Sequence, residues 1–191
     1  KAGGLLEKAA TLLRLSFNVA DASIFAFVDD LHNSNRTYCK ELWTALKDLN
    51  IKWGAQTTLF LGDDRELVKL AAESGCVAVF VGMESISNDS LEETNKAFNQ
   101  VKNFEDEIRM FHDHGIMVNP GMVFGFDHDD ESIFERTVNW LIKNRLELAY
   151  FNILTPLPGT ALFERYEKEG VIIDRDWSHY DGKHVVYRPK K

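Results

Sequence analysis

Five short stretches of the chain are apolar almost without interruption. Strands covered on both faces of a parallel sheet show such runs, whereas strands with one face in water alternate between apolar and polar residues. The sequence therefore predicts five buried strands. They are SIFAFV from Ser23, IKWGAQTTLF from Ile51, VAVFVG from Val77, IMVNPGMVFGF from Ile116 and LAYFNIL from Leu148.

The segments between these runs carry apolar residues at helical spacing, which predicts an amphipathic helix after each strand. A similar pattern opens the chain. The stripes are Leu5, Leu6, Ala9, Leu12 and Leu13; Tyr38, Leu42, Ala45, Leu46 and Leu49; Leu67, Leu70 and Ala71; Phe104, Ile108 and Phe111; Phe134, Val138 and Leu141; and Leu162, Phe163 and Tyr166.

Residues that favour helix ends flank several of these stripes. Asp63 with Glu66 matches a capping box, and Thr160 is a suitable first residue for the last helix. Gly75 and Gly170 follow stripes at positions where a left-handed glycine commonly ends a helix. These signals predict where two of the helices begin and end.

Strand and helix alternate without a hairpin signal, which calls for parallel pairing through crossover connections. An open doubly wound sheet and a curved or closed barrel both satisfy this pattern. The GxGxxG turn that would favour the doubly wound dinucleotide fold is absent from the sequence. We therefore favour an α/β barrel.

Charge and apolar content narrow the class of partner. The formal net charge of -8 and the isoelectric point near 5.3 argue against a general nucleic-acid or anionic-membrane surface. No apolar run reaches the roughly 18 residues that span a bilayer, and no signal-peptide pattern opens the sequence. We expect a cytoplasmic protein with a small-molecule partner.

Only two cysteines are present, Cys39 and Cys76, and they fall in different predicted repeats. A disulfide framework or a cysteine metal motif cannot be built from them. We expect two isolated buried thiols and no metal site. The histidine pairs His112/His114 and His179/His184 give no metal-binding spacing, since ligand pairs on a helix stand three or four residues apart.

Polar or backbone-special residues follow nearly every predicted strand. In a parallel barrel these strand ends lie on one face, where such folds place their active sites. Asp, Ser, Gly and Pro at these positions also cap helices and make turns. Capping is favoured over metal binding for Asp127 to Asp130, and both interpretations stay open for Asp29, Asp30 and Glu84. The strand-end residues are Asp29, Asp30, Gln56, Glu84, Ser85, Gly125, Asp127, Thr155, Pro156 and Gly159.

Six motifs taken in order resemble radical S-adenosylmethionine enzymes, most closely the group whose members often carry an N-terminal cobalamin-binding domain. They are FVDD at residues 27–30, GMES at 82–85, the pair Asn95 and Lys96, GMVFGFD at 121–127, LTPLPGT at 154–160 and the tail DWSHYDGKHVVYRPK at 176–190. The likeness extends from about Ser23 to the end of the chain.

The resemblance implies a (β/α)6 TIM-like barrel of which this chain is a part, with the first βα unit missing. Residues 1–170 would form the partial barrel, and residues 171–191 a tail that packs on it or leaves it. In that family a CxxxCxxC loop binds a [4Fe-4S] cluster, which reductively cleaves S-adenosylmethionine to generate a 5'-deoxyadenosyl radical. The motif is absent from these residues. We therefore expect a fragment that is inactive alone.

The resemblance also assigns strand-end residues to the cofactor. Asp29 and Asp30 match the motif that contacts the amino group of the methionine moiety, and an ammonium suits anionic acceptors. Glu84 matches a position that accepts from ribose hydroxyls. Gln56 would face the same site and contact cofactor or substrate.

Two further motifs would contact the adenine. Gly121, Phe124 and Gly125 match the glycine-containing strand along which the ring packs, where missing side chains let it approach the backbone. Thr155 and Pro156 match the place where the last strand meets the adenine edge. No residue of this chain is assigned to catalysis or to a metal.

The reaction stays open among methyl transfer, rearrangement and oxidation, because fold does not decide chemistry. Cobalamin would enter through another domain. The alternative is a non-catalytic α/β domain that binds a small molecule or a protein; an RNA-modifying relative is disfavoured by the acidic balance. Since the first strand of the family barrel is missing, we also expect self-association through the unpaired edge of the strand from Ser23.

Overall fold

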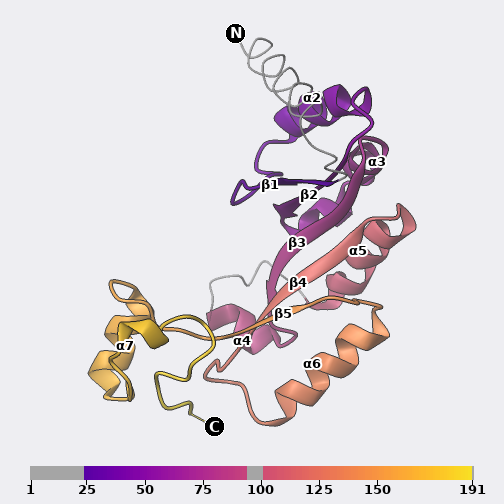
Figure 1. Ribbon diagram of the computed structural model, residues 1–191. Helices are drawn as coiled ribbons and strands as arrows, with labels where there is room; N and C mark the ends of the chain where they lie inside the picture. The colour runs from indigo at the N-terminus through magenta and orange to yellow at the C-terminus, as the bar shows by residue number, and fades with distance from the viewer. Residues whose placement is uncertain (1–23, 94–100, 191) are drawn as a thin grey trace. The chain divides into compact units, whose positions relative to one another are not determined.

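The computed structural model describes residues 24–93 and 101–190, with the side chain of residue 102 left aside (Figure 1). The helical pattern predicted from Leu5 to Leu13 and the pair Asn95 and Lys96 lie outside these residues. Two compact units divide the chain, the first formed by residues 1–82 and 103–119 and the second by residues 83–102 and 120–191.

The first unit contains three strand regions and the helices that follow them. Its elements are β1 Ile24–Phe27, α2 Arg36–Lys47, β2 Lys52–Thr57, the 3-10 helix η1 Leu59–Asp63, α3 Arg65–Glu73, most of β3 Cys76–Glu84, α5 Val101–Asp113 and the start of β4 Met117–Phe124.

The second unit begins at the end of β3 and contains the remaining elements. They are α4 Asn88–Glu93, most of β4, α6 Ser132–Lys143, β5 Tyr150–Ile153, α7 Ala161–Glu169 and the 3-10 helix η2 Trp177–His179.

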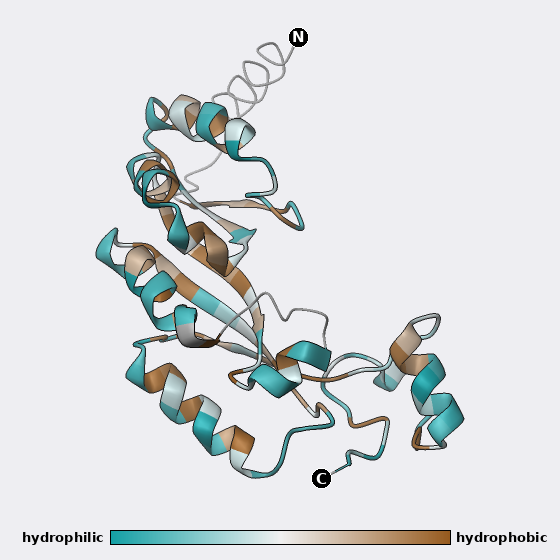
Figure 2. Cartoon of the chain, turned by 180° about the vertical axis from the view of Figure 1, so that it is seen from behind, coloured by the Kyte–Doolittle hydropathy of each residue, from teal (hydrophilic) through white to brown (hydrophobic). Residues whose placement is uncertain are grey.

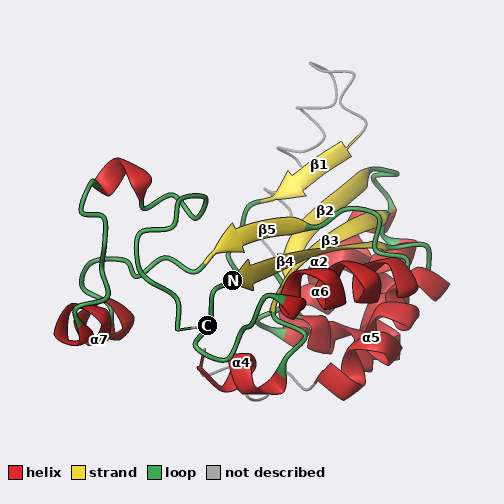
Figure 3. Ribbon diagram, turned by 90° about the horizontal axis from the view of Figure 1, so that it is seen from below, coloured by secondary structure: helices red, strands yellow, loops and turns green. Residues whose placement is uncertain are grey.

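The five strands form one sheet in the order in which they occur along the chain, β1-β2-β3-β4-β5 (Figure 3). Pairing is parallel between β1 and β2, between β2 and β3, and between β4 and β5. The sequence prediction of five parallel strands in chain order, an α/β partial barrel, is confirmed. Among the described helices, none is long and apolar enough to cross a membrane.

The core of the first unit is built around two indole rings. Trp43 of α2 and Trp53 of β2 are buried, and their ring centroids lie 5.6 Å apart. The indole N–H of Trp53 donates to the carbonyl oxygen of Ser74 at 3.1 Å, so this polar group is satisfied inside the core. Figure 2 shows apolar stretches, in brown, along parts of the strands.

The helix ends agree with the sequence signals at three positions and differ at one. Gly75, with φ of 99°, follows α3; Thr160 caps α7 by accepting from Phe163 N; and Gly170 ends α7 in the left-handed conformation. The prediction for α3 is wrong by one residue, because Asp64 caps this helix by accepting from Leu67 N. Asp63 belongs to η1, which occupies the turn before α3.

The predicted stripe of α6 is also wrong in part. Ile133, Thr137 and Leu141 are buried, whereas Phe134 is 54% and Val138 45% exposed. The buried stripe starts one residue earlier than predicted. It includes the polar Thr137, so the neighbouring positions looked more apolar in the sequence and were predicted instead. Leu141 alone is common to the predicted and the observed stripe.

The tail after α7 packs within the second unit. Tyr166 of α7 and Val186 and Tyr187 of the tail form a buried cluster, and Ile172 makes an antiparallel bridge with Tyr187. The tail thus folds back on α7. The predicted domain boundary between residues 170 and 171 stays a prediction.

Glu107 of α5 generates a prediction about stability and pH. Its carboxyl is buried, and burial together with the nearby Asp63 and Asp106 raises its pKa to about 7. The folded state therefore holds a proton that the unfolded chain releases above its ordinary pKa near 4.5. Stability is fully present below pH 4.5 and falls as pH rises through 7, by roughly 1 to 3 kcal/mol.

Urea unfolding at pH 5 and pH 8 measures this loss. Glu107→Gln should remove most of the pH-dependent difference in the free energy of unfolding, because the neutral amide does not titrate. The exposed Glu41→Gln on α2 is the control and should follow the wild type. An equal pH dependence in both variants would contradict the assignment to Glu107.

Candidate functional site

The strand-end residues of the first unit gather around the imidazole of His32. Asp29 lies two residues beyond β1, and its Oδ2 accepts a hydrogen bond from Nδ1 of His32 at 3.1 Å. The backbone N–H of His32 donates to the carbonyl oxygen of Gln56 in β2 at 2.9 Å. His32 is buried, whereas the side chain of Asp29 is 62% exposed. The structure therefore brings Asp29 and the Gln56 backbone to one buried histidine.

The loop after β1 is fastened to the end of β2 by a reciprocal pair of bonds. The side-chain amide of Asn33 donates to the hydroxyl of Thr58 at 2.9 Å, and its oxygen accepts from Thr58 N at 3.1 Å. The side chain of Gln56 is exposed at the same strand end. This loop is thus held in one conformation beside the exposed carboxylates.

Helix capping does not explain the two aspartates after β1. Asn35 is the N-cap of α2, and its side-chain oxygen accepts from Tyr38 N at 3.0 Å. Within the described ranges, Asp29 bonds to His32, and no hydrogen bond or ion pair engages the exposed Asp30. The capping alternative is therefore wrong for both residues.

Glu84 ends β3 in the second unit with an unusual backbone conformation. Its φ is 66°, and the next residue, Ser85, donates its N–H back to the carbonyl oxygen of Met83 at 2.9 Å. A non-glycine residue held at positive φ costs on the order of 1 to 3 kcal/mol, and such residues cluster at functional sites. The turn directs a half-buried carboxyl group away from the regular strand pattern.

The ends of β4 and β5 are joined side by side. Gly121 pairs with Tyr150 and Phe124 with Ile153 in the parallel ladder, and the carbonyl oxygen of Phe124 accepts from Leu154 N at 2.8 Å. Phe124 and Gly125 thus lie at the end of β4, beside the end of β5, whereas Gly121 lies opposite the first residue of β5.

The aromatic ring of Phe124 stacks on Phe151 with centroids 5.7 Å apart. Beyond β5, the Thr155 hydroxyl donates to the Ile153 carbonyl oxygen at 3.0 Å, and Pro156 is buried.

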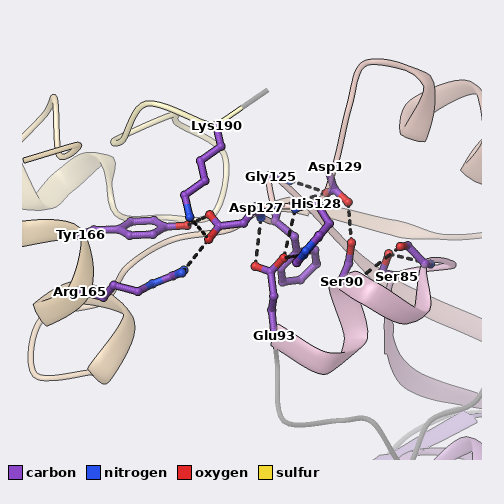
Figure 4. Close-up of polar contacts among 12 residues, drawn as sticks. Ser85, Ser90, Glu93, Gly125, Asp127, His128, Asp129, Arg165, Tyr166 and Lys190 are labelled. Carbon is purple, nitrogen blue, oxygen red and sulfur yellow. Dashed lines mark hydrogen bonds and ion pairs between the residues drawn. The ribbon is translucent and has the colours of Figure 1, made fainter. Parts of the chain in front are cut away.

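The turn after β4 is held by the buried carboxylate of Asp129 (Figure 4). Its Oδ2 accepts from the backbone N–H groups of Gly125 at 2.9 Å and Phe126 at 3.1 Å, and its Oδ1 accepts from the hydroxyl of Ser90 at 2.8 Å. Asp129 therefore binds the strand end. It does not cap α6, whose first amide at Ser132 donates to Asp130.

Gly125 is enclosed by the tail as well. Its φ is 104°, and its carbonyl oxygen accepts a hydrogen bond from the hydroxyl of Tyr187. A Cβ atom at this position would lie 2.2 Å from that hydroxyl oxygen. Only glycine fits here, for a reason that the sequence did not reveal.

Asp127 forms an ionic cluster with the tail and α7 (Figure 4). Its carboxylate accepts from Arg165 at 2.6 Å, from Lys190 at 2.5 Å and from the Tyr166 hydroxyl at 3.3 Å. Partial burial alone would raise the pKa of Asp127, but the bonds from Lys190 and Arg165 hold it below its usual value.

Glu93 of α4 completes the turn by accepting from the backbone N–H groups of Asp127 at 3.0 Å and His128 at 3.1 Å. The carboxylates of Glu93, Asp127 and Asp129 therefore bind backbone amides and side-chain donors of the protein itself. No group of three or more potential metal ligands occurs among the described residues.

Both cysteines are buried, as predicted. Burial raises the pKa of the Cys76 thiol to about 12 and raises that of Cys39 as well. Each thiol contacts a backbone carbonyl oxygen, Cys39 that of His32 and Cys76 that of Ala78. A neutral buried thiol is a poor metal ligand, because the thiolate is the binding form.

Sequence reasoning missed the residues that hold the strand ends. Ser90, Glu93, Tyr187 and Lys190 act through contacts with distant parts of the chain, and the last two were noted only as members of the tail motif. His32 was missed because nothing in the local pattern shows that its ring is buried beside Asp29. The cofactor roles predicted for Asp29, Asp30, Gln56 and Glu84, and for the residues of β4 and β5, stay predictions.

Comparisons with known proteins agree with the motifs. No family model matches the chain. It is 35% identical over 167 residues to bacteriochlorophyllide d C-12(1)-methyltransferase of Chlorobaculum tepidum, a match that covers 87% of this chain and 36% of the relative. It is 24% identical over 178 residues to anaerobic magnesium-protoporphyrin IX monomethyl ester cyclase of Cereibacter sphaeroides, covering 91% and 29%. The chain thus spans about a third of the length of these relatives.

Among solved structures, the chain resembles the radical S-adenosylmethionine methyltransferase TsrM from Kitasatospora setae, with cobalamin and a [4Fe-4S] cluster bound. The TM-score is 0.72 at 15% identity, and the match covers 93% of this chain and 33% of that one. This likeness shows the fold. Together with the ordered motifs and the curated relatives, it bears out the resemblance of the chain to the radical S-adenosylmethionine superfamily, and to the group whose members often carry an N-terminal cobalamin-binding domain.

Proposed function

We propose that this chain supplies the S-adenosylmethionine-binding strand ends of a radical enzyme. With a [4Fe-4S] cluster, bound S-adenosylmethionine supplies a 5'-deoxyadenosyl radical or a methyl group. The observation that carries the proposal is the carboxylate of Asp29, which is exposed, does not cap a helix and is held by a buried histidine. An oriented carboxylate is the acceptor that the ammonium of a methionine moiety needs.

The amino end of the cofactor would bind the residues after β1 and at the end of β2. Asp29 and Asp30 would share the ammonium, each as a charge-assisted acceptor, and the exposed side chain of Gln56 would reach cofactor or substrate. The positive charge of the bound ammonium would offset the repulsion between the two carboxylates.

The nucleoside would bind the residues at the ends of β3 and β4 and after β5. Glu84, held at positive φ, would accept from the ribose hydroxyls. Adenine would pack along Gly121, Phe124 and Gly125 of the β4 strand end, with its edge at Thr155 and Pro156. The ring of Phe124 packs on Phe134 and Phe151, so the backbone of this strand end would meet the base.

The cluster itself does not fit this chain. Three thiolates hold such a cluster, and the sequence contains two cysteines, both buried with raised pKa values. We therefore propose that the cluster ligands come from outside these 191 residues and that the chain alone starts no radical. Cobalamin would likewise bind another domain.

Methyl transfer to a small molecule is the reaction that we propose. The most similar relative described above is a methyltransferase, and the solved structure is one too, whereas the second relative is a cyclase. The excess of acidic residues, -8 in net charge, suits a small-molecule substrate better than a nucleic acid.

The amino-group assignment predicts a loss of affinity. In a cluster-loaded chain extended N-terminally to include a CxxxCxxC loop, Asp29→Ala with Asp30→Ala should raise the dissociation constant for S-adenosylmethionine about tenfold or more. Each charge-assisted bond is worth roughly 1.5 to 3 kcal/mol. Calorimetric titration measures the change, and the iron content should stay the same.

Asn35→Ala is the matched control, because Asn35 caps α2 in the same loop. It should lower the free energy of unfolding by about 1 kcal/mol and leave the affinity of the folded protein unchanged. If the double aspartate variant binds as tightly as the wild type, Asp29 and Asp30 do not belong to the cofactor site.

The cysteine count predicts the outcome of cluster reconstitution. Incubated with iron and sulfide under reducing, anaerobic conditions, the 191-residue chain should take up no stoichiometric cluster. Iron and labile-sulfide analysis and the visible absorption spectrum are the measurements. Four irons per chain that survive gel filtration would show that ligands other than three cysteines suffice.

We also propose self-association through β1, which is an edge strand of the described sheet. Unpaired backbone groups at an edge template pairing with another chain. Light scattering should show a dimer population that grows with concentration, and Ile24→Lys, at a position 63% exposed, should reduce it. A wild-type monomer at all concentrations would contradict the proposal.

A further inference from the structure

His32 joins two hydrogen bonds that run from the core of the first unit to its surface. The indole N–H of the fully buried Trp43 donates to Nε2 of His32 at 3.1 Å. On the opposite side of the ring, Nδ1 lies 3.1 Å from Oδ2 of Asp29. The series Trp43, His32, Asp29 thus leads from a core indole to an exposed carboxylate.

The indole determines which nitrogen of the imidazole carries the proton. Trp43 can only donate, so Nε2 of His32 must present its lone pair. The proton of the neutral ring is therefore on Nδ1, and it points to Asp29. The tautomer is thus set by a residue of the core and does not depend on a ligand.

The imidazole has little freedom to turn away. It stacks on Phe27 with ring centroids 4.6 Å apart and lies 5.7 Å from the ring of Trp53. Its backbone is also fixed, since its N–H donates to Gln56 and its carbonyl oxygen accepts from the Cys39 thiol. A side chain that is 1% exposed and packed between aromatic rings can position the carboxylate of its neighbour.

We propose that Trp43 and His32 are positioning residues that fix the Asp29 carboxylate for a ligand ammonium. His32 binds Oδ2, and Oδ1 stays available at the exposed strand end, so a cation meets an acceptor that is already oriented. This inference rests on the proposed function, and it assigns different roles to two adjacent residues. Asp29 is oriented by His32, whereas Asp30 is exposed and no hydrogen bond within the described ranges orients it.

A pair of substitutions separates the two bonds of His32. The amide of an asparagine lies near the place of Nδ1 and keeps a donor for Asp29, whereas the amide of a glutamine reaches the place of Nε2 and keeps an acceptor for Trp43. His32→Asn should lower the melting temperature and keep the S-adenosylmethionine dissociation constant within about twofold. His32→Gln should keep the melting temperature and raise that constant about tenfold.

Both variants are measured in the extended, cluster-loaded chain by calorimetric titration and thermal unfolding, beside Asp29→Ala. If Asp29→Ala weakens binding and His32→Gln does not, the positioning role is overturned and the proposed function stands. If Asp29→Ala leaves binding unchanged, the proposed function fails at this residue, and the inference fails with it.

The tautomer is tested without any cofactor. In this chain with 15N-labelled imidazole, nitrogen chemical shifts should show Nδ1 of His32 protonated and Nε2 unprotonated. Trp43→Phe removes the indole donor and should shift the population toward the other tautomer. A proton on Nε2 in the wild type would overturn the inference, whatever the binding measurements show.

Discussion

Parallel backbone pairing between successive strands is the constraint on which the site depends. Because β1 pairs with β2 and β4 with β5 in the same direction, the carboxyl ends of paired strands fall at the same edge. The inner strands β2, β3 and β4 are largely buried, so polar side chains are disfavoured in their middles and occur near their ends, as Gln56 and Glu84 do. The edge strands β1 and β5 of the described sheet are largely exposed, so the prediction of five buried strands is wrong for these two.

The strand-end carboxylates are held by different means, and the difference separates structural from binding roles. Asp129 is buried, and both of its oxygens accept from protein donors, so it stabilises the turn and has nothing left for a ligand. Asp127 is likewise engaged by Arg165 and Lys190. Asp29 is held through one oxygen by a buried donor while most of its side chain faces solvent. A carboxylate of this kind is oriented and still available.

Local patterns in the sequence predicted the strands, their order and several helix ends, because burial of a strand and a left-handed glycine leave marks within a few residues. The predicted N-cap of α3 was wrong by one position, because Asp63 and Asp64 are adjacent and both can cap a helix. The predicted buried face of α6 was wrong because one of its buried residues, Thr137, is polar. The bond from Tyr187 to Gly125, across 62 residues, could not be predicted, since nothing local requires it. The same holds for the bond from Trp43 to His32.

Gly125 shows why a matching glycine is weak evidence for a cofactor. The motif implies a glycine that lets adenine approach, yet the Tyr187 hydroxyl already excludes a Cβ atom there, so the fold would require glycine without any ligand. Asp29 gives stronger evidence, because it caps no helix and an exposed carboxylate oriented by a buried histidine restricts its own freedom. The positive φ of Glu84 is weaker evidence, since Asn50 and Arg145 share that conformation. Restricting the Asp29 carboxylate costs conformational entropy, and a bound cation that it contacts would offset this cost.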